Sequence, residues 1–93
     1  MLIKYKEDID KQLIGYKHYY ILDDKLEDFI EGINKKGSVL NDLNNYVELF
    51  DVSGILLVIE TKQREVVRRK QEYYRIYNGS DIFWGEIEDF ERL

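Results

Sequence analysis

The sequence contains no cysteine, no proline and only one histidine, and each of these shortages excludes a class of protein. Without cysteine, the chain cannot form a disulfide scaffold, a thiolate zinc site, an iron–sulfur cluster or a cysteine nucleophile. With His18 as its single histidine, one chain cannot form a two-histidine zinc motif. The lack of proline excludes collagen-like and polyproline chains. Any metal site in this chain is therefore expected to use oxygen ligands.

Long apolar segments are absent as well. The longest run, residues 55–59, is far shorter than the roughly 20 residues of a membrane-spanning helix. The N-terminal segment 1–8 becomes acidic before the apolar core of a signal peptide can form. We therefore expect a soluble, cytoplasmic protein with no membrane partner. Residues 1–93 are expected to form one small domain, for which a homodimer would be a second source of stability.

Two segments have the apolar spacing of an amphipathic helix. In residues 3–14 the apolar side chains recur every four positions, which predicts a short helix. Residues 24–36 predict a second helix, because Asp24 and Glu27 have the spacing of a capping box and Gly37 supplies a stop.

Four segments rich in aromatic and β-branched residues predict strands. They are residues 16–22, 46–52, 55–62 and 81–87. Ser53 and Gly54 separate the second and third segments, which predicts that these two strands form a hairpin. The third segment begins with a run that is apolar at every position, so we expect it to lie centrally in the sheet.

Residues 65–77 allow two interpretations. On a helical wheel the apolar and tyrosine side chains fill one half and the arginines cluster opposite, which favours a helix that ends at Asn78-Gly79. The alternative is a strand, so that residues 72–87 form a hairpin turning at Asn78-Gly79. With the helix, the predicted fold is α+β: a three- to four-stranded sheet with a central hairpin, packed by two or three helices.

Charge is distributed unevenly along the chain, although the net charge is −5. Residues 62–75 hold six Lys or Arg against two Glu, whereas residues 76–93 hold one Arg against five acids. The basic segment begins with the lysine of Glu60-Thr61-Lys62, at the end of a predicted buried strand. Glu60 and Lys62 would project from the same face of that strand, because side chains alternate with a period of two.

A carboxylate beside an ammonium at the end of a strand suits metal-dependent phosphodiester chemistry. The Glu60 carboxylate can bind Mg²⁺, and the Lys62 ammonium can orient a metal-bound water that attacks a phosphate. A second carboxylate would come from the preceding strand, with Asp51 and Glu48 as the two candidates. The candidates for binding the phosphate backbone of a nucleic acid are Arg64, Arg68 and Arg75.

An apolar strand that ends in Glu60-Thr61-Lys62, followed by a predicted helix, resembles the PD-(D/E)xK nuclease superfamily over residues 46–87. That family's core runs αβββαβ, with one helix inserted here after the first strand. The resemblance implies that Glu60 is a metal ligand, that Lys62 is the catalytic lysine, and that Gln71 on the following helix assists on the substrate side. It implies a small Mg²⁺-dependent nuclease, or a degenerate relative, that acts on nucleic acid phosphodiesters.

A second class of function is also consistent with the sequence. The small size, the net charge of −5, the eight tyrosines and the acidic segment 76–93 are typical of a non-catalytic interaction protein. One example of such a protein is an immunity or phage-type inhibitor of a nucleic-acid enzyme. Its carboxylates would occupy the basic groove of the enzyme, and its tyrosines would provide anchors.

Overall fold

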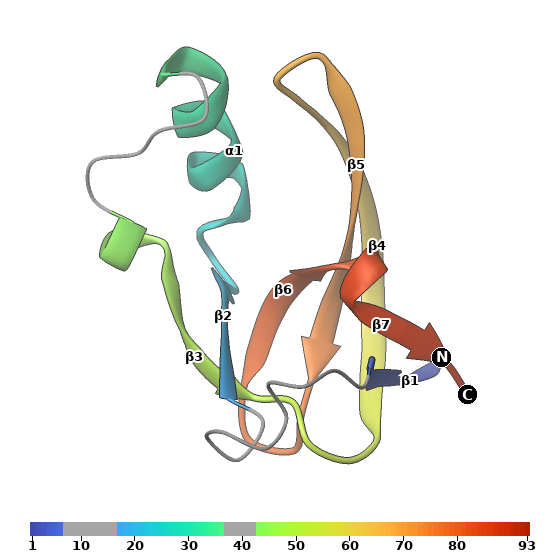
Figure 1. The fold of residues 1–93 in the computed structure, drawn as a ribbon. Coiled ribbons are helices and arrows are strands. Elements are labelled where there is room, and N and C mark those ends of the chain that lie inside the picture. The colour runs from blue at the N-terminus through green and yellow to red at the C-terminus, as the bar shows by residue number, and fades with distance from the viewer. Residues whose placement is uncertain (7–16, 37–42) are drawn as a thin grey trace.

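The structure is a computed structural model that describes residues 1–6, 17–36 and 43–93. Seven antiparallel strands form one sheet in the order β3-β2-β6-β5-β4-β1-β7, and the described part of the chain has a single α-helix, α1 (Figure 1). The strands are β1 (Leu2–Tyr5), β2 (Lys17–Leu22), β3 (Val47–Asp51), β4 (Leu56–Val66), β5 (Arg69–Tyr77), β6 (Ile82–Glu86) and β7 (Phe90–Arg92). The helices are α1 (Leu26–Lys36) and the short 3-10 turns η2 (Leu43–Asn45) and η3 (Ile87–Asp89).

The predicted three- to four-stranded sheet with two or three packing helices is therefore wrong. Its largest error is the helix at 65–77, because that segment contains the end of β4, a turn and the whole of β5. Tyr73 and Tyr74 are both buried but belong to two different cores, so the alternation that marks a strand is absent here. The alternative interpretation is correct, since β5 pairs with β6 across the turn at Asn78-Gly79.

Two further predictions about local structure need correction. The N-terminal helix is wrong where the structure describes it, because residues 3–5 belong to β1; residues 7–14 lie outside the described residues. The strands on either side of Ser53-Gly54 are confirmed, but they do not form a hairpin. β3 pairs with β2 at one edge of the sheet, whereas β4 lies between β5 and β1.

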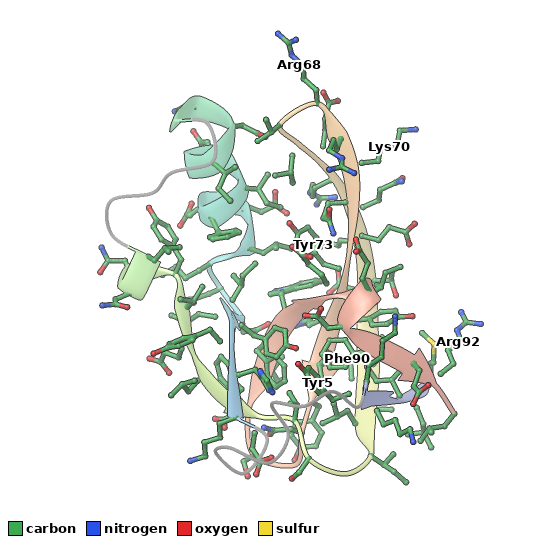
Figure 2. The ribbon with its side chains drawn as sticks, viewed as in Figure 1. Tyr5, Arg68, Lys70, Tyr73, Phe90 and Arg92 are labelled. Carbon is green, nitrogen blue, oxygen red and sulfur yellow. The ribbon has the colours of Figure 1, made fainter. Side chains whose placement is uncertain are left out.

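The sheet curls so far that strands from its two ends approach each other. Tyr5 in β1 stacks on His18 in β2 with ring centroids 4.4 Å apart, and Phe90 in β7 lies 5.6 Å from the ring of Tyr20 in β2. Figure 2 shows Tyr5 and Phe90 close together inside this curl. The curl encloses the larger core, whose most buried members are Ile3, Val52, Leu56, Ile76 and Phe83.

The helix α1 packs on the outer face of the sheet. Its apolar side chains Leu26 and Ile30 cover a smaller core formed with Ile21, Tyr73 and Trp84. This is the apolar face that the sequence predicts for residues 24–36. The two cores therefore lie on opposite faces of the same sheet.

A β-bulge in β4 changes which of its side chains face each core. Val58 pairs with Ile76 on β5, but Glu60 pairs with Arg75, so Ile59 is an extra residue on this strand. Up to Val58 the even-numbered side chains face the enclosed core, and from Glu60 onward they face α1. The bulge thus places the charged end of β4 under the helix.

Beyond the bulge, β4 and β5 continue as a long hairpin that rises beside α1 (Figure 1). The hairpin turns at Val67 and Arg68, which both have positive φ, 48° and 64°. Asn34, near the end of α1, joins the helix to this turn: its Nδ2 donates to the carbonyl of Glu65 at 2.9 Å, and its Oδ1 accepts from the N–H of Val67 at 2.8 Å.

Candidate functional site

Glu60 and Lys62 lie on the same face of β4, as the sequence predicts. The Lys62 ammonium is 3.8 Å from a Glu60 carboxylate oxygen and also 3.8 Å from an oxygen of Glu27 on α1. It lies 5.2 Å from the centre of the Trp84 ring, within the range of a cation–π contact. Lys62 is therefore positioned by two carboxylates and an indole of its own chain.

Two of the three arginines predicted to bind phosphate are paired with carboxylates in the same way. Arg75 donates from Nε and Nη2 to both oxygens of Asp23 at 2.7 and 2.9 Å, and its Nη1 is 3.5 Å from Glu60. Arg64 contacts Glu27 with its Nε at 3.0 Å and its Nη2 at 2.9 Å. The hydrogen bond from Arg64 holds the pKa of the Glu27 carboxyl below its usual range. These guanidinium groups are already neutralised within the chain.

The predicted metal ligands are not brought together. Glu48 and Asp51 lie on the edge strand β3, and β2, β6 and β5 separate that strand from Glu60 on β4. Asp51 Oδ1 instead accepts hydrogen bonds from the N–H and hydroxyl of Ser53, which lower the Asp51 pKa. Within the described residues, no three acidic or histidine side chains are grouped so that they could hold a metal ion. Mg²⁺ binding stays a prediction from the sequence.

The two remaining predicted residues, Gln71 and Arg68, do not lie on a helix. Gln71 lies on β5 opposite Arg64, and its Nε2 donates to Glu88 in η3 at 3.3 Å. Arg68 is at the turn of the β4–β5 hairpin, and Figure 2 shows Arg68 and Lys70 projecting from it into solvent. Together with Arg69, they form the basic tip (Arg68, Arg69 and Lys70), whose three side chains are all exposed.

Three acidic residues form a negatively charged surface at the end of β6, in contrast to the basic tip. This acidic group consists of Glu86, Glu88 and Asp89. Partial desolvation and repulsion from Asp89 and Glu88 raise the pKa of the Glu86 carboxyl. In residues 1–6, 17–36 and 43–93, the recorded side-chain partners of the group are the Tyr20 hydroxyl, 3.1 Å from Asp89, and the Gln71 amide; no Lys or Arg there pairs with it.

Sequence reasoning missed the residues that neutralise the basic segment. Asp23 and Glu27 hold Arg75 and Arg64, whereas the sequence pattern predicts only a place in the capping box for Glu27 and no role for Asp23. Their pairing spans 52 residues for Asp23 and 37 for Glu27, so no local spacing could have indicated it.

No protein-family model matches the chain, and no curated protein or solved structure matches it either. Among the described helices, none has both the length and the apolar character that crossing a membrane requires. The functional proposals below therefore rest on the geometry of the chain itself.

Proposed function

We propose that this chain is a non-catalytic acidic interaction protein that binds a basic surface of a partner protein. The observation that carries the proposal is the uneven pairing of its charges. Lys62, Arg64 and Arg75 are neutralised by carboxylates of the same chain, which leaves little positive charge there for a phosphate. No Lys or Arg of the described residues pairs with the acidic group, so within that part of the chain its carboxylates are not neutralised.

Electrostatics supports a basic partner on two length scales. At close range, a cation from a partner would offset the partial desolvation and the repulsion from Asp89 and Glu88 that together raise the pKa of Glu86. At long range, the net charge of −5 would steer a basic protein toward the chain and repel a nucleic acid. A nucleic-acid enzyme, whose groove is basic, is a partner of this kind, and this chain would then act as its inhibitor.

The test measures binding to a labelled oligo-arginine peptide by fluorescence anisotropy at several salt concentrations. We expect salt-dependent binding that the triple variant Glu86→Gln, Glu88→Gln, Asp89→Asn weakens by about tenfold or more. The matched control removes three exposed charges elsewhere, with Glu48→Gln, Glu65→Gln and Glu72→Gln. Equal loss in both triple variants, or no binding of the peptide by the wild type, would contradict the proposal.

The basic tip favours a second candidate function, in which the β4–β5 hairpin contacts a nucleic acid backbone. A two-stranded ribbon fits the major groove of DNA, and exposed cations at its end would contact phosphates. In this case the chain binds duplex DNA rather than the peptide. Replacing Arg68, Arg69 and Lys70 with Gln should then reduce the steepness of log affinity against log salt concentration by about three, because three phosphate contacts are lost. DNA binding that these three changes leave unaltered would reject this candidate.

The nuclease interpretation of Glu60-Thr61-Lys62 stays a prediction with a test of its own. It requires that Mg²⁺ supports cleavage of DNA and that Lys62→Ala abolishes it, because the lysine would act on the attacking water. The matched control is Lys70→Ala at the basic tip, which also removes one cation. Cleavage that survives Lys62→Ala would show that another group, or a contaminant, is responsible.

A further inference from the structure

A hollow of about 240 Å³ opens where β2 and β6 separate. The two strands pair only at Ile21–Trp84 and at Leu22–Phe83, and no pairing continues to Tyr19 and Glu86. These last two side chains flank the hollow, which extends to Phe29 on α1. The volume is below the roughly 300–1,000 Å³ of pockets that hold drug-sized ligands, so it suits a single side chain.

Aromatic rings form much of the wall. Tyr19 is 66% exposed at the rim, Phe29 is partly buried, and Trp84 is only 3% exposed. Trp84 already attracts a cation, because the Lys62 ammonium lies 5.2 Å from the centre of its ring. The electron-rich faces of such rings attract cations, and arginine in particular stacks on them.

Two carboxylates complete the wall. Glu86 and Asp89 line the hollow, and in the described chain neither is paired with a Lys or Arg. Asp89 is held in place by the hydroxyl of Tyr20, whose oxygen is 3.1 Å from Asp89 Oδ2. Rings and carboxylates that converge on a space of side-chain size define a cation site, and a planar fork of N–H donors fits it better than a point charge.

We infer that this hollow binds the guanidinium group of an arginine side chain presented by the partner protein. The inference rests on the proposed function and names the anchor residue that the partner would supply. The guanidinium stacks against the aromatic wall and donates to Glu86 and Asp89, while the aliphatic stem of the arginine passes the exposed ring of Tyr19. One arginine buried in this way would be the centre of the interface, where the binding energy is concentrated.

The experiment titrates the full chain with the peptide acetyl-Gly-Arg-Gly-amide and follows it by heteronuclear NMR. Trp84 is the only tryptophan, so its indole N–H, which donates to the Asp23 carbonyl at 2.9 Å, gives a single resonance beside the hollow. We expect saturable shifts of that resonance and of the Gly85 and Glu86 amides. The citrulline peptide, which has the same shape without the charge, should bind about tenfold more weakly or worse. Equal binding of the citrulline or lysine peptide would overturn the assignment.

Variants localise the effect. Tyr19→Ala, at the exposed rim, and Glu86→Gln, at the wall, should each weaken the arginine peptide several-fold. Glu65→Gln removes the same charge at the far end of the hairpin and should leave binding unchanged. Shifts that appear only outside the hollow, or equal affinity in all three variants, would contradict the inference.

The two proposals fail in different ways. If oligo-arginine binds the wild type and Glu86→Gln equally, but not the triple variant, the hollow does not hold the anchoring arginine. The proposed function, binding of a basic partner through the acidic group, would still be supported. If oligo-arginine does not bind while the short peptide shifts Trp84, the hollow is a cation site and the proposed function is wrong.

Discussion

In the folded chain, the surroundings of Glu86 disfavour the charged form of its carboxyl group. Partial desolvation and the carboxylates of Asp89 and Glu88 raise its pKa, whereas Glu27, beside Arg64, has a lowered pKa. The two glutamates therefore affect stability in opposite directions as pH changes. Residues that work against stability in the free protein are often those that contact a ligand.

Glu86→Gln is expected to stabilise the free protein near pH 7 by up to about 0.5 kcal/mol. A carboxyl whose pKa is raised by folding destabilises the native state once the pH exceeds its unfolded value of about 4.3, so the gain should vanish in acid. Thermal unfolding across this range measures it, with Glu65→Gln as the control. A variant that is less stable than wild type at neutral pH would show that the Glu86 carboxylate has a favourable partner.

At the scale of elements, the sequence predicts what depends on neighbouring residues. The helix at 24–36 and the strands at 16–22, 46–52 and 81–87 are confirmed to within a few residues, because their patterns are local. At β5 the sequence favours a helix over the correct alternative, a strand, because β5 is covered on both faces and its residues do not alternate between buried and exposed. The bulge at Ile59 could not be predicted from the sequence either, because a residue is extra only relative to the strand that pairs with β4. The same limit applies to the site: the shared face of Glu60 and Lys62 was predictable, but the contacts of Lys62 with Glu27 and Trp84 were not.

The turn of the β4–β5 hairpin contains a residue poorly suited to its backbone. Val67 has a φ of 48°, a left-handed conformation that disfavours β-branched side chains and suits Asn. Val67→Asn should therefore raise the free energy of unfolding by about 1 kcal/mol, since the valine side chain is half exposed and little packing is lost. Urea denaturation measures the change, and Val67→Thr, which keeps the branched side chain, should give no gain. A loss of stability in the asparagine variant would show that the valine side chain matters at this tip.

At the scale of the whole molecule, the arrangement depends on contacts between distant segments. β3 and β4 follow each other in sequence, yet three strands separate them in the sheet. The curl also brings β7 against β2, where Tyr20 contacts both Phe90 and Asp89. The hairpin predicted at Ser53-Gly54 would place Glu48 and Asp51 beside Glu60. The observed strand order places them on the edge strand β3 instead, with three strands between them and β4.

Gly85 on β6 packs against the rings of Phe90 on β7 and Tyr20 on β2. A Cβ atom on this residue would be 2.9 Å from Phe90 and 3.1 Å from the ring of Tyr20, closer than packed atoms approach. Gly85→Ala should destabilise the protein by about 2 kcal/mol, because the rings must move apart. Chemical denaturation measures this loss, and Ser80→Ala in the exposed turn before β6 is the control. An unchanged stability would indicate that the two ends of the sheet are less tightly packed than their ring contacts suggest.

The bulge at Ile59 gives β4 an unusual response to insertion and deletion. Losing one residue from a regular strand reverses the faces of the part beyond it, but losing Ile59 would make β4 regular and leave Glu60 opposite Arg75. Glu60, Lys62 and Arg64 would still face α1, and Thr61, Gln63 and Glu65 would still face the other side of the sheet. Position 59 is thus a place in β4 where the chain can lose one residue without changing which charges face the helix, so a chain one residue shorter here would keep the ion pairs of Lys62 and Arg64 with Glu27.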